Sequence, residues 1–524
     1  MPMLSKRWRY AAWIAVIAGF AGLHALHLRA DFPNHSPWYS DWAKYTDEGW
    51  YGNAAVRAHL YGRWYAPGDF NPAVALPAWP FLEWLLFFFT GVGIQAARGL
   101  ATAFFFANLA LSYLLLRARG PRWMALTALT LLVTSPFLYC FARLAILEPL
   151  LTALVLAALN IAIRSPQFKR PVLASCAVGL LFTFMMLTKT TALFLLPALV
   201  WATLVPLRKH FRLMTRCALG AAAAAALSYG LWMIVIARFH LLADYRYLFY
   251  INTYPKPSQV TWPLTSLWWS FHGGLWVDHI LIPLAGIVSG AAVLAWRTRY
   301  SRSLLADPLF GASILAVIGY LLFMTVQNHP QPRYFAVITF FCFFLIAQAT
   351  ATLMQEGGRA RQLGWTVMAT AIVAGAVNAA WTLSFAFYPQ YTFMTAATQV
   401  EQYIDQHPNG KRLLVSISGD QLSLMTHLPA LCDDFGTQEL SAKMDAYQPG
   451  WYAAWNDLDP GTLADIHTHY SLEQVAAFHA LDDPNRNVLV LFRLHPLPHG
   501  QIRDQSDMNL QAMQPEDRIA IPIE

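Results

Sequence analysis

Long apolar runs alternate with short polar connections through most of the chain, from Arg9 to Tyr388. Uncharged runs of this length are typical of membrane-spanning helices, each of which needs about 20 apolar residues. We therefore predict an all-α polytopic membrane protein with about eleven transmembrane helices. The approximate spans are residues 10–28, 97–116, 123–141, 147–163, 171–188, 190–206, 215–237, 278–296, 308–327, 333–353 and 364–386.

Basic residues between the runs predict the orientation. Lys6, Arg7 and Arg9 precede the first span and place the N-terminus in the cytoplasm, because positive charge favours that side. The later basic loops fall on the same side only if the run WPFLEWLLFFFTGVG at 79–93 does not cross the membrane. That run is shorter than a span requires, so we predict a juxtamembrane helix on the outer surface, with a short tilted span as the alternative.

The chain becomes polar after Tyr388. The segments RLLVSIS (412–418) and NVLVLFRL (487–494) have the pattern of strands, and helices are predicted near 396–406 and 471–480. These elements predict a small α/β domain in the periplasm. The predicted organisation is a transmembrane domain at 1–390 that includes a first periplasmic loop at 29–96, the α/β domain at 391–500, and a loose tail at 501–524.

Composition agrees with a membrane protein. Of the 524 residues, 57% are hydrophobic and only 12% are charged, whereas soluble proteins carry roughly 25% charged residues. The net charge of +7 does not indicate nucleic-acid binding, because the basic residues lie in short loops between spans. The five cysteines form no CxxC pair, so neither a disulfide nor a cysteine metal site is predicted.

Charged residues at the predicted outer ends of the spans are the candidates for chemistry. A charge at a helix centre in a membrane costs about 2.5–3.5 kcal/mol, so charges near this depth need a reason. Separate segments of the chain bring such residues to one depth. They are Asp47, Glu48, Arg98, Arg143, Glu148, Lys189, His329 and Arg333. A carboxylate there can act as a general base, and cations can hold a phosphate leaving group. We therefore predict group transfer from a lipid-linked phosphate donor.

Each candidate residue is also consistent with a purely structural role. Asp47 and Glu48 fit solvated charges or the N-terminal cap of a helix after Thr46. Arg143 and Glu148 fit a local ion pair. Lys189 fits a side chain that snorkels to the membrane surface. Arg333 with Tyr334 fits an interfacial anchor, and Arg98 fits a topogenic charge. His59, in an aromatic and basic loop, fits a structural role as well.

Several segments, in their order and spacing, carry a resemblance to a known family. They are TDEGWYGNAAVRAHLYGRW (46–64), NPAVALPAWPFLEWLL (71–86) with the following Arg98, FARLAILEPLLTALVLAAL (141–159), LTKTTALFLLPAL (187–199) and HPQPRYFAV (329–337). Together they resemble the C-type integral-membrane glycosyltransferases, in particular bacterial relatives of the protein O-mannosyltransferases and of lipid A aminoarabinose transferase. The resemblance covers roughly residues 1–390. The proline-rich segment reads NPAVALP instead of the His-Pro-Pro-Leu form of the mannosyltransferases, which argues against protein O-mannosylation.

The resemblance implies an inverting hexosyl or pentosyl transfer from a polyprenyl-phosphate sugar to a periplasmic lipid, glycan or protein acceptor, in the bacterial inner membrane. It implies that Asp47 is the catalytic base, Glu48 its structural or electrostatic partner, and Glu148 a second acidic position. Lys189, Arg333 and His329 would contact the donor phosphate. No cofactor is required, although a divalent cation at Asp47, Glu48 and Glu148 is compatible with the residues.

Three further function classes are consistent with the same residues. An enzyme of similar architecture that transfers a whole oligosaccharide is one. A transporter or flippase is another, although the charges lie at the ends of spans and repeated halves are not evident. The third is a non-catalytic membrane binding protein whose C-terminal domain carries the function.

Overall fold

The computed structural model describes residues 6–33, 36–248, 278, 281–294, 299–326, 331–481, 483 and 486–498. The chain divides into two compact units. The helical unit consists of Met1–Leu28, Val74–Trp79 and Arg98–Tyr388. The α/β unit consists of Arg29–Ala73, Pro80–Ala97 and Pro389–Glu524. The first loop after the N-terminal helix therefore belongs to the same unit as the C-terminal part of the chain. The domain boundaries drawn from the sequence remain a prediction.

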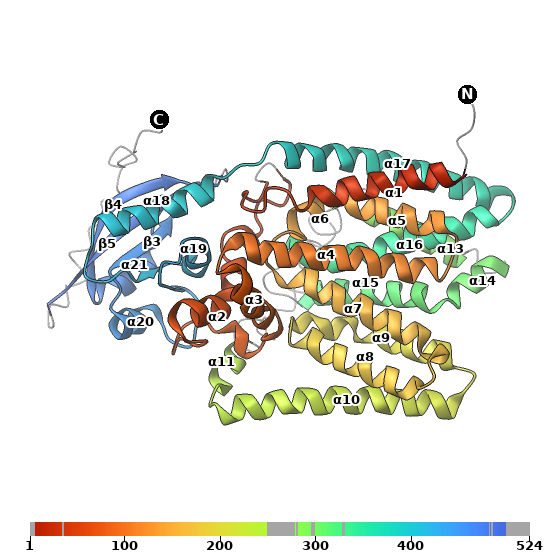
Figure 1. The fold of residues 1–524 in the computed structure, drawn as a ribbon, viewed down its shortest axis with the longest axis horizontal. Coiled ribbons are helices and arrows are strands. Elements are labelled where there is room, and N and C mark those ends of the chain that lie inside the picture. The colour runs from red at the N-terminus through yellow and green to blue at the C-terminus, as the bar shows by residue number, and fades with distance from the viewer. Residues whose placement is uncertain are drawn as a thin grey trace. The chain divides into compact units, whose positions relative to one another are not determined.

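The helical unit is built from long apolar helices, drawn as the parallel and antiparallel rods of Figure 1. Its elements are α1 (Lys6–Leu23), α4 (Ile94–Arg117), α5 (Arg122–Thr134), α6 (Pro136–Phe141), α7 (Leu147–Arg164), α8 (Pro171–Met186), η4 (Thr190–Leu195), α9 (Leu196–Leu204), α10 (Phe211–Arg238), α11 (Leu242–Arg246), α13 (Leu281–Leu294), α14 (Arg299–Leu305), α15 (Pro308–Val326), η8 (Pro332–Tyr334), α16 (Phe335–Gln355) and α17 (Gly358–Phe387).

Burial distinguishes the centre of the helical unit from its edge. Among the seven described helices long enough to span a membrane, α16 is the most enclosed, and it contacts α5, α13, α15 and α17. Helix α10 packs against α8 but exposes most of its length, including Leu227 and Leu231, which are 71% and 65% exposed. Apolar side chains at such exposure suit a lipid environment rather than water.

The predicted membrane helices are confirmed as elements. Each of the eleven predicted spans falls on described helical elements, although 123–141 is divided between α5 and α6 and 190–206 between η4 and α9, and the chain is a multi-pass membrane protein. By length and composition, seven described helices qualify as spans, and five shorter apolar helices of 10–17 residues accompany them. Helix α3 (Ala78–Thr90) has 13 residues and is shorter than a span needs, as expected for the run at 79–93. The number of eleven spans and the orientation remain predictions.

The α/β unit contains a five-stranded sheet. Besides α2 (Asp47–Tyr61) and most of α3, its elements are α18 (Thr392–Gln406), β1 (Leu414–Val415), α19 (Gly419–Thr426), β2 (Ala430–Leu431), α20 (Leu440–Tyr447), β3 (Trp451–Trp455), α21 (Pro460–His467), β4 (Tyr470–His479) and β5 (Val488–Pro496). The strand order is β2-β1-β3-β5-β4, with β1 parallel to β2 and β3 and the remaining pairs antiparallel. The predicted small α/β domain is confirmed.

Alternate residues of each strand face opposite sides of the sheet, and each side has a core. In β3, Trp451 and Trp455 pack with α18 and α19 on one side, whereas Tyr452 packs with α20 and α21 on the other. Tyr45, from the first loop, belongs to the first of these cores. The sheet is thus covered by helices on both faces, and the first loop is part of its packing.

The helix predicted near 471–480 is wrong. This segment is β4, which pairs with β5 from Tyr470 to His479, with an irregularity between Gln474 and Ala476. Its sequence YSLEQVAAFH contains good helix formers. The partner strand provides hydrogen bonds and packing over the whole segment, and such tertiary pairing overrides local preference.

Candidate functional site

The two adjacent acids open helix α2. Thr46 precedes the helix but makes no capping hydrogen bond through its side chain. Its hydroxyl lies 3.0 Å from both the Trp42 carbonyl oxygen and Asp47 Oδ1. Asp47 is 1% exposed and Glu48 is 0% exposed. The interpretation of these acids as solvated charges is therefore wrong, because a buried carboxylate must be held by specific partners.

Helix α19, more than 360 residues later in the chain, supplies such a partner. The side chain of Gln421 accepts a hydrogen bond from the Gly49 backbone amide at 2.7 Å and donates one to Glu48 Oε2 at 3.2 Å. Just before α19, the Ile417 carbonyl accepts a hydrogen bond from Trp50 Nε1 at 3.2 Å. The first turn of α2 is therefore fixed by contacts within the α/β unit.

A buried cluster of charges continues this contact along α2. Arg57 Nη2 donates to Asp69 Oδ2 at 2.5 Å and to Asp420 Oδ1 at 2.9 Å. Asn53 Nδ2 donates to Asp420 Oδ2 at 3.0 Å, and Lys443 Nζ donates to Asp69 Oδ1 at 3.2 Å. Two cations thus match two anions, which limits the cost of burying them.

Burial and neighbouring charges shift the pKa values in this cluster in identifiable ways. Burial alone would lower the pKa of Arg57, but the carboxylates of Asp420 and Asp69 raise it above its ordinary value. Burial raises the pKa of Asp420 to about 6, against the opposing positive charge of Arg57. The cluster therefore keeps Arg57 charged and makes Asp420 easier to protonate than an ordinary aspartate.

A second group of predicted residues meets in the helical unit. Lys189, between α8 and η4, forms a buried ion pair with Glu148 in the first turn of α7. The Lys189 ammonium lies 4.3 Å from the ring centre of Tyr334, and the Arg333 guanidinium lies 5.1 Å from the same ring. Three chain segments that are distant in the sequence thus bring two cations, one acid and one aromatic ring together.

These contacts argue against several of the structural roles that the sequence suggested for these residues. Glu148 pairs with Lys189 instead of Arg143, so a local ion pair between Arg143 and Glu148 is not what the structure contains. Lys189 is 6% exposed and held by a carboxylate, which excludes snorkelling to a polar surface. Arg333 is 4% exposed and is also more buried than an interfacial anchor would be.

The remaining predicted residues have other partners. Arg143 donates to the Tyr139 hydroxyl and to the His27 carbonyl, and Arg98 donates to the Leu28 carbonyl at 3.0 Å. Both arginines therefore bind the chain just after α1. His59 lies near the end of α2 with Nε2 2.9 Å from the Trp84 carbonyl oxygen, in an aromatic contact with Phe88. His329 and most of the aromatic loop at 238–277 fall outside the described residues.

Sequence reasoning did not identify Asp69, Asp420, Gln421 or Lys443. One signal was available, because Asn53 and Arg57 are four residues apart and share a face of α2. That face needed buried partners, but nothing local indicates that they lie in the C-terminal part of the chain.

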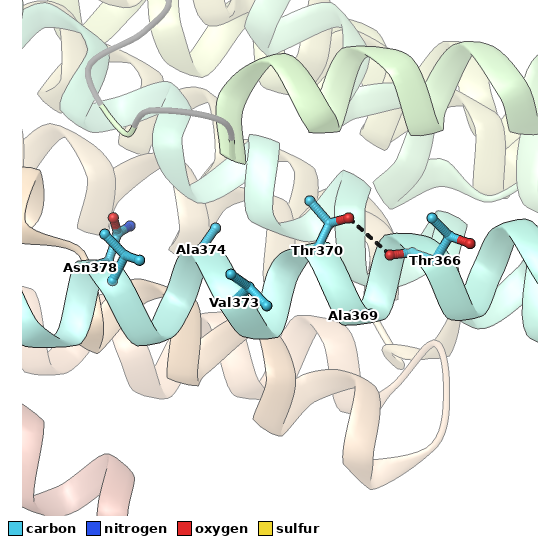
Figure 2. A pocket seen from close by; sticks show the side chains of 7 residues that line it. Thr366, Ala369, Thr370, Val373, Ala374 and Asn378 are labelled. Atoms are coloured by element: carbon cyan, nitrogen blue, oxygen red, sulfur yellow. Dashed lines mark hydrogen bonds between the residues drawn. The ribbon is translucent and has the colours of Figure 1, made fainter.

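A groove of about 500 Å³ follows one face of α17 (Figure 2). Asn378 is the last of the α17 residues that line the groove. It donates to Asp278 Oδ1 at 3.2 Å, and Ser135 Oγ donates to the same carboxylate. Most of the lining is apolar or consists of threonines bonded to their own helix, as with Thr370 and the Thr366 carbonyl at 3.0 Å. The groove therefore presents few polar groups that could bind a ligand or take part in a reaction. Within the described ranges, no three His, Cys, Asp or Glu side chains are grouped as metal ligands would be.

Comparison with known proteins gives a likeness of fold. No family model matches the chain, and no curated protein matches it in sequence. Among solved structures, ArnT from Cupriavidus metallidurans bound to undecaprenyl phosphate matches with a TM-score of 0.59 and 14% identity, over 93% of this chain and 98% of that chain. Its apo form gives a TM-score of 0.58 at 13% identity, over 92% and 98% of the two chains.

The archaeal oligosaccharyltransferase AglB from Archaeoglobus fulgidus, solved with an inhibitory peptide and a dolichol-phosphate, is a further match. Its TM-score is 0.52 at 12% identity, over 96% of this chain and 75% of that chain. The fold expected from the resemblance, that of the C-type membrane glycosyltransferases, is thereby confirmed. At these identities the likeness is one of fold.

Proposed function

We propose that this chain is a membrane glycosyltransferase that moves a sugar from a polyprenyl-phosphate donor to a lipid, glycan or protein acceptor with inversion at the anomeric carbon. The observation that carries the proposal is the likeness of nearly the whole chain to a protein solved with undecaprenyl phosphate. The buried acids of α2 and the cation group of the helical unit supply the two kinds of side chain that such a reaction needs.

In this proposal Asp47 is the general base. It removes a proton from the acceptor nucleophile, which attacks the anomeric carbon from the face opposite the phosphate. A new bond forms from the acceptor to the sugar, the bond from the sugar to the phosphate oxygen breaks, and the phosphate leaves with the bonding electrons. Glu48 supports the charge and position of Asp47.

Lys189 and Arg333 are the proposed contacts of the donor phosphate. Cations that are already in place stabilise the negative charge that develops on a leaving phosphate. Glu148 holds the Lys189 ammonium by their ion pair, and the Tyr334 ring lies beside both cations. A pre-formed group of this kind needs little reorganisation during the reaction.

We further propose that the N-terminus is cytoplasmic and that the α/β unit lies in the periplasm of a bacterial inner membrane. This orientation is supported by the basic residues that recur in alternate loops between the helices. The donor sugar and the acceptor would then meet outside the cytoplasm.

The test is sugar transfer in membranes supplied with radiolabelled polyprenyl-phosphate sugars, comparing wild type with Asp47→Asn. The amide keeps the size of the side chain and removes the base. We expect label to reach an acceptor with wild type and a loss of about 100-fold or more with the variant. Transfer at the wild-type rate by Asp47→Asn would overturn the base assignment. Failure of the wild type with hexosyl and pentosyl donors would instead favour a transporter or a binding protein.

A further inference from the structure

Gln421 connects the C-terminal part of the chain to the two acids of α2. Its side chain is 0% exposed and uses both ends of its amide: the oxygen accepts from Gly49 N, and the nitrogen donates to Glu48 Oε2. Glutamine can make both bonds because it carries an acceptor and a donor on one planar group. A carboxylate in its place could accept from Gly49 but could not donate to Glu48.

The position of Gln421 is itself fixed. It lies in the first turn of α19, directly after Asp420, which accepts hydrogen bonds from Asn53 and Arg57 of α2. The backbones of α2 and α19 approach so closely that a Cβ built on Gly49 would lie 2.1 Å from the Gln421 nitrogen. The amide therefore reaches Glu48 from a backbone that is in direct contact with the same helix turn.

The hydrogen bonds of Gln421 fix the position of the acidic pair, and position affects the rate of catalysis. Misplacement of a reacting group by about 1 Å can cost on the order of 100-fold in rate. Glu48 is adjacent to Asp47, and both belong to the turn that the amide holds. A neutral amide also holds the Glu48 carboxylate without adding a charge beside the proposed base.

We propose that Gln421 is a positioning residue for glycosyl transfer, whose amide holds Glu48 and the Gly49 backbone so that Asp47 is presented to the acceptor. This inference rests on the proposed function. It assigns to the C-terminal part of the chain a direct role at the reaction site, beyond that of an appended domain.

The test compares steady-state transfer by full-length wild type, Gln421→Glu and Gln421→Asn in detergent or membranes. Gln421→Glu keeps the side-chain size but places a second carboxylate oxygen against Glu48, and Gln421→Asn withdraws the amide by one methylene. We expect kcat to fall 10- to 100-fold in both variants, with the KM for the donor unchanged within about twofold. Gln402→Glu, at an exposed position of α18, is the matched control for the change of charge and should behave as wild type.

A double-mutant cycle separates positioning from a general loss of structure. Glu48→Gln combined with Gln421→Glu restores one amide facing one carboxylate. If Gln421 acts through Glu48, the double variant will be at least fivefold more active than the product of the single effects predicts. The inference would be overturned if the loss in the double variant equalled the product of the two single losses. An unchanged kcat in both Gln421→Glu and Gln421→Asn would overturn it as well. Should Gln421→Glu fail to fold, Gln421→Asn still decides through the split between kcat and KM.

The same experiment distinguishes this inference from the proposed function. Asp47→Asn is measured in parallel. An active wild type that loses transfer in Asp47→Asn but not in the Gln421 variants leaves the proposed function standing and removes the role of Gln421. A wild type without transfer removes both.

Discussion

The Gly49 Cα faces the backbone of Gln421 so closely that a methyl group on it would lie 2.1 Å from the Gln421 nitrogen. Real side chains do not tolerate such a distance, so the two helices must separate when any side chain is introduced. Glycine at position 49 is therefore required by the contact between α2 and α19, and not by its backbone conformation.

Gly49→Ala should accordingly destabilise the α/β unit by about 1–3 kcal/mol, the usual cost of overpacking, and reduce transfer together with it. Thermal unfolding of the purified protein in detergent measures the first effect. Gly93→Ala is the control, because a Cβ at Gly93 meets no atom within 4 Å. Equal unfolding temperatures for the two variants would contradict the close approach.

The Lys189–Glu148 pair allows structure and donor binding to be separated. Removing one member of a buried ion pair leaves an uncompensated charge and costs about 3–5 kcal/mol. We therefore expect Lys189→Met and Glu148→Gln to unfold at lower temperature than wild type, and the double variant Lys189→Met/Glu148→Leu to recover most of the loss.

Transfer should stay low in that double variant, because a stable fold without Lys189 still lacks the proposed phosphate contact. The comparison is made at equal amounts of folded protein. A double variant that is both stable and fully active would show that Lys189 serves the fold alone.

Asp420 predicts a pH effect on stability. Its pKa is about 6 in the folded protein, against about 3.9 for an unfolded chain. Between these values the folded state binds the proton more tightly, so this carboxyl makes folding less favourable as the pH rises from about 4 to about 6. Above that window its contribution is constant.

The measurement is the unfolding temperature of wild type minus that of Asp420→Asn at several pH values from 4.5 to 7.5, roughly the span of the expected change. Because asparagine does not titrate, any deficit of the variant relative to wild type should shrink as the pH rises towards about 6. A deficit independent of pH would show that Asp420 does not titrate there.

Trp50 offers a test of how α2 is held. Its indole contacts the rings of Phe70 and Phe435 and donates to the Ile417 carbonyl. Trp50→Phe keeps most of the packing and should cost about 1 kcal/mol for the lost hydrogen bond, whereas Trp50→Ala should cost about 3–5 kcal/mol. Chemical denaturation of the two variants distinguishes these costs, and equal losses would assign the contribution to the hydrogen bond.

The helical unit was predictable because lipid imposes a simple pattern. A long run without charges, such as Phe335–Gln355, has few alternatives to a membrane helix, and the structure has a helix there. Lys189 and Glu148 stood out for the same reason, since a charge in such surroundings needs a partner. Their pairing with each other was not evident, because 41 residues separate them.

The α/β unit was less predictable. Strand β1 lies within the strand predicted at 412–418, but β2 has only two residues, which is too short for a pattern, and β4 contains the residues of a helix. Gln421 and Asp420 were missed because a polar pair in a polar region carries no local sign of burial. Their importance arises only when α2 is packed against them.

The α/β unit is built from parts of the chain that are far apart in the sequence, and this has a consequence for biosynthesis. Gly49 and Gln421 are 372 residues apart, so at about 5–20 residues per second the ribosome needs roughly 20–75 s to supply the second after the first. During that interval Glu48 and Gly49 are synthesised without the Gln421 amide to which both are hydrogen-bonded in the folded protein. A nascent chain stopped at any point before α19 therefore lacks the environment of its acidic pair, and the proposed active site is completed only near the end of translation.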